Sequence, residues 1–287
     1  MNTKRSFQIK KFIGDRAFYK RYLMLALPMI LQNAITNLVS FLDNIMVGQL
    51  GTEQMSGVAI VNQLIFVYNL AIFGAASAAS IFGAQYFGKG NHEGHMYSFR
   101  FKLYATMFVT ILAITLFITN GENLISLYLT DTAGTGATDV ALRYGKQYLS
   151  IMLIGLVPFA VTQSYATNIK ETGQTFVPMA ASFVAVGSNA VLDYLLIFGI
   201  GPFPKLGVMG AALATILARY IEAAIIVIWA HSHKEKNKYL AGAYRGFGMP
   251  MGEFKAILIK GFPLMLNELL WAAGMTAVTQ CYSVRGL

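Results

Sequence analysis

Polar and apolar positions in this chain are grouped in long blocks instead of alternating residue by residue. Uncharged apolar runs of about 20 residues recur, and each can cross the roughly 30 Å hydrocarbon core of a bilayer as a helix. An open chain in lipid must satisfy its backbone hydrogen bonds within each segment, so helices are the expected form. The runs predict seven membrane-spanning helices, near residues 22–47, 56–82, 103–119, 147–167, 176–200, 207–230 and 256–284.

The first and the last of these runs share a local pattern. LMLALPMILQN around Pro28 can be set beside LIKGFPLMLNE around Pro263, and each copy follows a basic segment. Transporters are commonly built from duplicated halves. We therefore expect an all-α polytopic membrane protein with a six-helix N-terminal lobe, plus the first helix of a second, repeat-related lobe whose remainder is missing from this sequence. The expected boundaries are 1–21 for a basic N-terminus, 22–231 for the lobe, 232–255 for the inter-lobe loop and 256–287 for the seventh helix.

Composition and charge fix the expected orientation. Of the 287 residues only 12% are charged, about half the share usual in a soluble protein, and the net charge is +9. Of the 22 lysines and arginines, 17 fall on one side of the predicted spans, which includes the N-terminus and the 232–255 loop. The positive-inside rule places that side in the cytoplasm of a cell membrane. The basic residues are then explained by the membrane topology and by contact with membrane lipid. We expect no nucleic-acid partner.

Acidic residues inside the predicted spans are the first candidates for function, because a charge in the membrane is costly. Asp43 and Asp193 lie at similar distances from the ends of the first and fifth spans, so they can share one pocket. Asn189 lies one turn before Asp193 on the same helix face. Two carboxylates with an amide can bind a proton or Na⁺, and a structural polar contact between helices is the alternative.

Three other ionisable residues within the spans are candidates. Arg219 and Glu222 are three residues apart on the sixth span, a spacing that favours a structural ion pair. Glu268 lies midway along the seventh span with no base near it in sequence, which favours a role in ion coupling or substrate binding. The four histidines, by contrast, are expected to be solvated loop residues without metal-site spacing.

Several segments resemble one transporter family. They are LDNIMVGQLG at 42–51, GAQYFGKGN at 83–91, IKETGQTFVPM at 169–179, NAVLDYLLIFG at 189–199 and PKLGVMGAALAT at 204–215. Together they are similar to the multidrug and toxic compound extrusion (MATE) transporters, and the likeness covers nearly the whole chain. Lys170 departs from the family pattern, which usually has arginine at that position.

The resemblance carries expectations about architecture and function. Family members have twelve helices in two six-helix lobes and export amphipathic, often cationic compounds in exchange for H⁺ or Na⁺. The resemblance implies that Asp43, Asn189, Asp193 and Thr215 form the cation site of the N-terminal lobe, and that Glu268 occupies the acidic position of the seventh helix. It implies small-molecule substrates, no cofactor beyond the coupling ion and no enzymatic activity.

Three other functions are weighed against this one. A lipid-linked oligosaccharide flippase would need a more basic central cavity than one embedded arginine provides. A non-transporting membrane scaffold or sensor would have no reason to bury acids at matched depth. A membrane-embedded hydrolase would need a nucleophile beside a base, and the spans contain no histidine or paired-aspartate motif for it.

Overall fold

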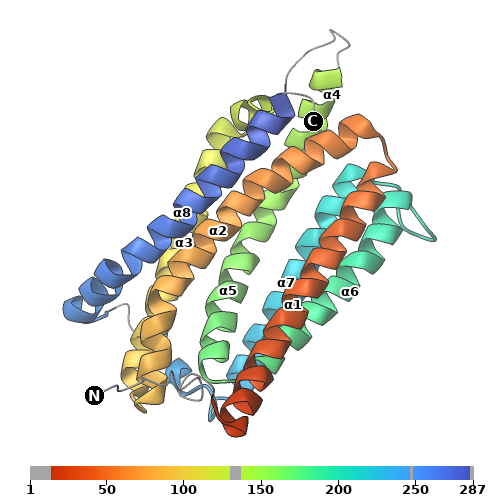
Figure 1. The fold of residues 1–287 in the computed structure, drawn as a ribbon. Helices are drawn as coiled ribbons and strands as arrows, with labels where there is room; N and C mark the ends of the chain where they lie inside the picture. The colour runs from red at the N-terminus through yellow and green to blue at the C-terminus, as the bar shows by residue number, and fades with distance from the viewer. Residues whose placement is uncertain (1–13, 130–136, 246–247, 285–287) are drawn as a thin grey trace, which may run out of the picture.

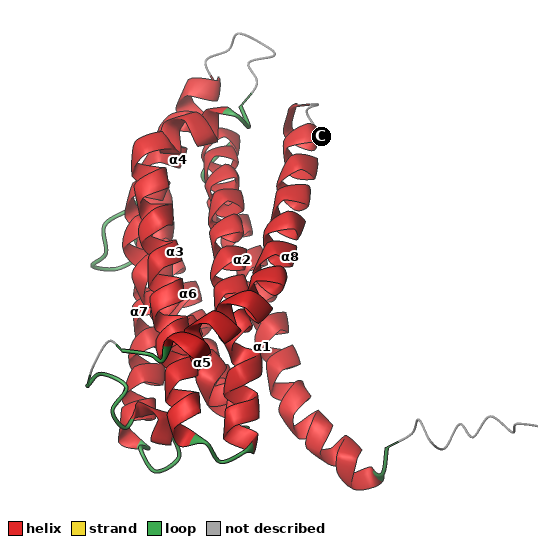
Figure 2. Ribbon diagram, turned by 90° about the vertical axis from the view of Figure 1, so that its left-hand side faces the viewer, coloured by secondary structure: helices red, strands yellow, loops and turns green. Residues whose placement is uncertain are grey.

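The chain folds as a bundle of long helices. The computed structural model describes residues 14–129, 137–245 and 248–284, and the described part is helix and loop without strands (Figures 1 and 2). The elements are α1 (Arg16–Gly48), α2 (Thr52–Gly88), α3 (His92–Ser126), α4 (Ala137–Met152), the 3₁₀ turn η2 (Leu153–Gly155), α5 (Leu156–Glu171), α6 (Phe176–Phe198), α7 (Val208–Ser232), the 3₁₀ turn η3 (Lys238–Leu240) and α8 (Met251–Val284).

The predicted number of spans is confirmed. Among the described residues, seven helical segments are long and apolar enough to cross a membrane, and one of them joins α4, η2 and α5. The outer faces of the bundle are apolar. On α3, for example, Phe108, Ile111 and Ile118 are all exposed, as lipid-facing residues are. The chain is therefore an all-α, multi-pass membrane protein.

The fourth span is interrupted in its middle by the η2 turn. A short 3₁₀ stretch interrupts the regular i→i+4 hydrogen bonds of an α-helix, and here two carbonyl groups accept hydrogen bonds from side chains of other helices. The Gly155 carbonyl accepts a hydrogen bond from Arg219 of α7 at 3.2 Å, and the Leu156 carbonyl accepts one from Tyr68 of α2 at 2.9 Å. The turn thus ties the fourth span to both α2 and α7.

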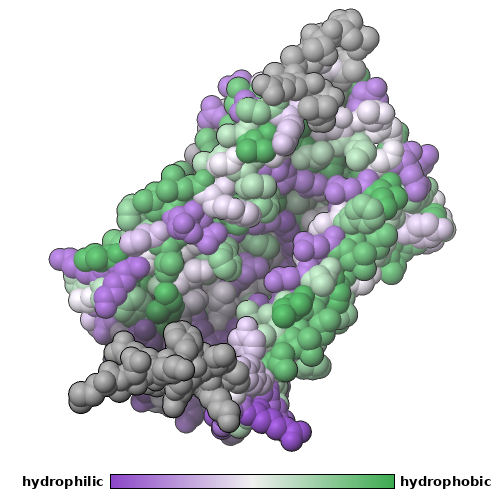
Figure 3. Space-filling view, viewed as in Figure 1, coloured by the Kyte–Doolittle hydropathy of each residue, from purple (hydrophilic) through white to green (hydrophobic). Residues whose placement is uncertain are grey.

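The helices gather in two groups with a hollow between them. In Figure 1, α1, α6 and α7 stand together on one side, and α2 and α8 stand on the other. The α4–α5 span packs against both α2 and α7, so it joins the two groups. Figure 3 shows hydrophilic residues along the hollow, bordered by apolar outer surfaces.

Small residues allow the closest helix contacts. A Cβ atom at Gly210 of α7 would lie 2.6 Å from the carbonyl oxygen of Leu196 on α6. A Cβ atom at Gly261 of α8 would overlap the Cβ of Ala78 on α2. Glycine at these positions permits helix backbones to pack closely, as is common in membrane bundles.

The end of the bundle where α2 ends and α3 begins differs from the sequence prediction. The third helix begins at His92 instead of near residue 103, so His95, Arg100 and Lys102 lie within α3 and are buried. The expectation that His95 is a solvated loop residue is therefore wrong. The apolar run marked only the central part of this helix, because its first turns are buried through polar pairing.

That pairing forms what we call the α3–α5 charge cluster: His95, Lys102, Asn168 and Glu171. The Lys102 ammonium donates to Asn168 Oδ1 at 2.6 Å and to the Glu171 carboxylate. His95 Nε2 lies 3.3 Å from the other Glu171 oxygen. Each charged group of the cluster thus meets an opposite charge or an amide.

Arg100 makes a separate set of contacts beside this cluster. Its guanidinium donates to the backbone carbonyls of Gly242, Ala243 and Gly248 at 2.6–2.8 Å. These carbonyls belong to the segment that connects α7 to α8, so Arg100 fixes that segment to α3.

Candidate functional site

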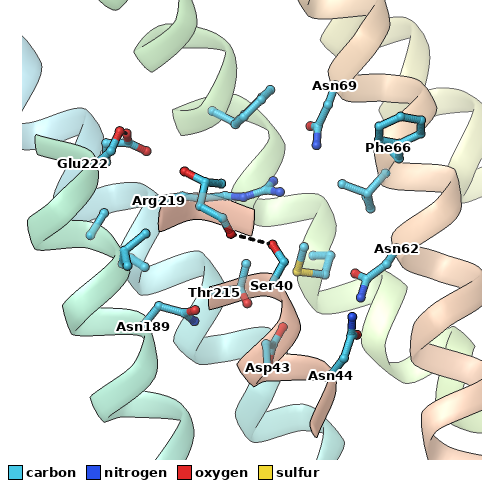
Figure 4. A pocket seen from close by; sticks show the side chains of 18 of the residues that line it. Ser40, Asp43, Asn44, Asn62, Phe66, Asn69, Asn189, Thr215, Arg219 and Glu222 are labelled. Atoms are coloured by element: carbon cyan, nitrogen blue, oxygen red, sulfur yellow. Dashed lines mark hydrogen bonds between the residues drawn. The ribbon is translucent and has the colours of Figure 1, made fainter. Parts of the chain in front are cut away.

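The hollow contains a pocket of about 380 Å³, within the range of sites for small organic ligands. It lies between α1, α2, α6, α7 and the fourth span (Figure 4). The lining residues are Thr36, Ser40, Asp43 and Asn44 of α1; Asn62, Ile65, Phe66 and Asn69 of α2; Tyr148, Met152 and Phe159 of the fourth span; Ser182, Ala185, Val186 and Asn189 of α6; and Thr215, Ala218, Arg219 and Glu222 of α7.

Asp43 and Asp193 meet at one end of this pocket. Each lies five residues before the end of its helix, Asp43 on α1 and Asp193 on α6, so the two helices place them at the same depth. Their carboxyl groups lie close together. Asp43 lines the pocket, whereas Asp193 is only 1% exposed and lies beside it.

Several polar atoms around these carboxylates have no hydrogen-bond partner among the described residues. They are Asp43 Oδ1, both carboxylate oxygens of Asp193, the Asn189 amide nitrogen and Asn69 Oδ1. A buried polar atom left unpaired costs about 1–3 kcal/mol, and more when it is charged. Such a cost is typical of a site that is completed by a ligand or ion.

Asn189 and Thr215, the other two residues of the predicted cation site, line the same pocket. Both line the pocket at the end where Asp43 lies, and Figure 4 shows the three side chains near one another. Carboxylate, amide and hydroxyl oxygens are the hard ligands that suit Na⁺, and carboxylates also accept protons. The described residues contain no cluster of three or more His, Cys, Asp or Glu side chains arranged for a metal ion.

Arg219 and Glu222 do not form the predicted ion pair, which is absent from the salt bridges of the described residues. Arg219 is drawn to the fourth span, where it bonds the Gly155 carbonyl and lies 5.0 Å from the ring centroid of Phe159. Glu222 accepts a hydrogen bond from Ser182 of α6 instead. Both side chains line the pocket. Two residues that the sequence analysis gave a structural role therefore lie in the candidate site.

Glu268 lies outside this pocket. Its helix, α8, packs against α2, and the Cβ of Glu268 faces Gly74 of α2, where an added Cβ would lie 3.4 Å away. The residue is half-buried and, among the described residues, forms no salt bridge. Its role in coupling or substrate binding stays a prediction.

Sequence reasoning missed most of the polar wall, because it started from the ionisable residues. Thr36, Ser40 and Asn44 are spaced one turn apart on α1, and Asn62 and Asn69 are two turns apart on α2. Uncharged polar residues repeating on one face of an apolar helix indicate a polar lining, so the signal was present. Tyr148 is 1% exposed and donates to Asn62 Oδ1 at 3.2 Å, a contact that no local pattern indicated.

Comparisons with known proteins agree with this architecture. The chain is 26% identical over 280 residues to the probable multidrug resistance protein NorM of Thermotoga maritima, and 24% identical over 261 residues to the protein of the same name from Halalkalibacterium halodurans. These matches cover 93% and 91% of this chain but 55% of each relative. The chain thus spans about half the length of the curated relatives it matches.

Solved structures show the same fold. A crystal structure of MATE in the bent conformation superposes with a TM-score of 0.73 at 23% identity, covering 90% of this chain and 55% of the other. An outward-facing multidrug resistance MATE family transporter also gives a TM-score of 0.73 at 23% identity, covering 89% and 54%. The family model MatE matches residues 28–195, which is more than half of the chain. This chain therefore belongs to the MatE family.

Proposed function

We propose that this chain forms the N-terminal lobe and the first helix of the second lobe of a cation-coupled antiporter. The antiporter exports amphipathic, often cationic compounds across the cell membrane in exchange for H⁺ or Na⁺. The observation that carries the proposal is the meeting of Asp43 and Asp193, from two different helices, at one end of a polar pocket in a membrane bundle. The function is transport, the activity named for the outward-facing structural neighbour, and not catalysis.

The pocket suits both the ion and the substrate. Asp43, Asp193, Asn189 and Thr215 offer oxygen atoms to the coupling ion, and no other cofactor is needed. Apolar side chains such as Phe66 offer surface to the apolar part of a substrate. When the ion occupies the carboxylates, their charge is neutralised and the preferred arrangement of α1 and α6 changes, which expels the substrate. The ion gradient supplies about 2.3 kcal/mol per charge per 100 mV of membrane potential.

Two alternatives fit the pocket less well. A lipid-linked oligosaccharide flippase would bind an anionic pyrophosphate, yet the lining contains the acids Asp43 and Glu222 against one arginine. A scaffold or sensor gives no reason to leave the carboxylate oxygens of Asp193 buried and unpaired. An antiporter uses such groups directly.

The proposal is tested by ion-driven efflux from proteoliposomes that contain the intact protein, with a Na⁺ or a pH gradient imposed. Asp43→Asn and Asp193→Asn should each abolish efflux while expression stays largely intact, because the amide keeps the side-chain shape and cannot titrate. Asp139→Asn is the matched control, since Asp139 is exposed at the start of α4. Normal efflux by either pocket variant would contradict the assigned role.

The proposed orientation places the N-terminus and the α7–α8 connection in the cytoplasm. Lys234 and Lys205 are exposed in connections at opposite ends of the bundle, and the exposed Cys281 can be replaced by serine beforehand. In intact cells an impermeant thiol reagent should label Lys205→Cys and leave Lys234→Cys unlabelled. The reverse pattern would overturn the topology.

A further inference from the structure

A second concave site lies on the outside of the bundle and shares no lining residue with the polar pocket. It has a volume of about 510 Å³ and is lined by residues of α2 (within 71–78), α3 (within 101–109) and α8 (within 254–269). We call it the α2–α3–α8 groove. Its lining residues are aliphatic or aromatic apart from one glycine, and the Tyr104 hydroxyl is their only polar side-chain group. The groove therefore suits an apolar ligand.

The groove results from the way in which its three helices pack. α2 packs closely against both α3 and α8, whereas α3 and α8 hardly touch each other, so a gap is left between them over α2 (Figure 1). The α2 side is lined by Ala71, Ala75 and Ala78, whose small side chains leave this gap open. Gly261 of α8 lies against Ala78. Small residues thus form the base of the groove, and α3 and α8 form its two walls.

Aromatic side chains supply most of the surface of these walls. Tyr104 and Phe108 of α3 line the groove, as do Phe254 and Phe262 of α8, and these four side chains are 38–66% exposed. The groove is therefore open to the surroundings of the bundle, which for membrane-spanning helices are lipid acyl chains. A cleft with a narrow base between two aromatic walls fits an unbranched hydrocarbon chain.

The groove runs along the depth of one membrane leaflet. On α8 its lining extends from Phe254 to Leu269, about 22 Å at about 1.5 Å per residue. One leaflet contributes about half of the roughly 30 Å hydrocarbon core, so this length is sufficient for one acyl chain. Phe254 lies in the first turn of α8, at the end of the bundle that we propose to be cytoplasmic. The groove therefore belongs to the cytoplasmic leaflet.

A basic residue lies at this end of the groove. Lys255 directly follows Phe254 and is one turn before Leu258, and both of those neighbours line the groove. Lys255 is exposed and takes no part in the salt bridges of the described residues. Lysine residues near the membrane surface attract anionic lipid headgroups. Charge complementarity thus indicates an anionic phospholipid whose acyl chain occupies the groove.

We propose that the α2–α3–α8 groove binds one acyl chain of an anionic phospholipid of the cytoplasmic leaflet, with the lipid phosphate near Lys255. The bilayer is as apolar as the groove, so the hydrophobic effect does not drive the chain from one to the other. The groove offers van der Waals contacts on three sides, whereas a flat helix face offers them on one. The bound chain fills the gap between α3 and α8. This inference does not depend on the proposed transport function.

The test uses the intact, purified protein in lipid nanodiscs that contain phosphatidylglycerol with a photoactivatable diazirine in its acyl chain. Labelled peptides are identified by mass spectrometry. The α3 and α8 peptides of the groove should be labelled about 10-fold more than the lipid-facing part of α6, the ratio that about 1.4 kcal/mol of additional contact produces. The α6 reference residues Phe183, Val184 and Val191 are also exposed and lie outside the groove.

Two results of this experiment would overturn the proposal. Equal labelling of the groove and of α6 would show that only bulk lipid contacts both surfaces. An unlabelled groove would show that another part of the intact protein covers it.

Variants that change the shape of the groove test whether its cavity binds the chain. Ala105→Leu places a larger side chain in the groove, and should lower labelling of the groove to the level of α6. Ala273→Leu is the matched control, since Ala273 is exposed on α8 outside the groove, and it should leave the labelling unchanged. If Ala105→Leu fails to fold, Phe108→Ala removes part of a wall at a side chain that is 66% exposed. Labelling that neither groove variant lowers would contradict the proposal.

Competition between unlabelled lipids tests the position of the headgroup. Phosphatidylglycerol should displace the photoactivatable lipid more effectively than the zwitterionic phosphatidylethanolamine. Lys255→Gln should reduce this preference about 5-fold, which corresponds to about 1 kcal/mol per basic residue near the surface. Lys260→Gln is the matched control and should change the preference little, because Lys260 is exposed on the same helix but lies over the Phe82 ring, outside the groove. Equal effects of the two substitutions would contradict the placement of the phosphate at Lys255.

Discussion

Two regions of this bundle bury charged side chains and treat them in opposite ways. In the α3–α5 charge cluster, Lys102 is 0% exposed and its ammonium contacts both Asn168 and Glu171. In the pocket, Asp193 is 1% exposed and both its carboxylate oxygens lack a hydrogen-bond partner among the described residues. These two side chains are equally buried, so burial alone does not distinguish them.

The difference is whether other residues of the chain pair with the buried charge. A buried charge that is paired and hydrogen-bonded contributes to the packing of its helices, whereas one left unpaired raises the free energy of the folded state. Lys102 and Glu171 join α3 to α5. Asp43 and Asp193 are left for something that the chain does not supply, which we propose to be the coupling ion.

The largest expected effect comes from breaking the paired cluster. Lys102→Met leaves the Glu171 carboxylate buried without its main partner, and removing one member of a buried pair costs about 3–5 kcal/mol. The free energy of unfolding should fall by that amount in a denaturant titration of the purified protein. Efflux per folded molecule should stay close to that of the parent.

A double variant sharpens this prediction. Lys102→Met combined with Glu171→Gln removes both charges and should be clearly more stable than Lys102→Met alone, because no buried charge is left uncompensated. Simple addition of the two single effects would show that the cluster is not a coupled pair. A loss of efflux without a loss of stability would place the cluster in the transport machinery.

A smaller effect is expected at Glu268, which resembles the pocket acids more than the cluster. It is half-buried on α8 and forms no salt bridge within the described part of the chain. Glu268→Gln should therefore leave the melting temperature equal or slightly higher, since it removes an uncompensated charge without changing shape.

Efflux assays of the same variant define its role. Transport of a cationic dye should fall more than transport of a neutral dye if the carboxylate contacts substrate, and both should fall alike if it contacts only the ion. A large loss of stability with unchanged efflux per folded molecule would show that Glu268 is a structural residue.

Most of the fold could be predicted from the sequence, because hydropathy alone determines how many helices can cross the membrane. All seven spans were expected, yet the third began too late, since hydropathy counts Arg100 and Lys102 as solvent-exposed. Their burial depends on partners on α5 and on the α7–α8 connection, far away in sequence. Hydropathy reports single residues and does not register such pairs.

Part of the candidate site was also predictable, by counting residues along each span. Asp43 and Asp193 share a depth, and depth follows from counting residues along each span. The separation of Arg219 from Glu222 was not predictable, because their spacing permits a pair and only contacts with Gly155 and Ser182 draw them apart. Competition between local and distant partners is decided by the packed bundle.

The central claim is that Asp43 and Asp193 are left unpaired in order to bind the coupling ion, and thermal unfolding of the intact protein tests it most directly. The melting temperature is measured at constant ionic strength while Na⁺ replaces a large organic cation, and again over a pH series. Binding to the folded state raises the melting temperature with ion concentration. The parent protein and Lys102→Met should respond to one of the two ions, whereas Asp43→Asn and Asp193→Asn should not. An unchanged response in the two aspartate variants would contradict the account.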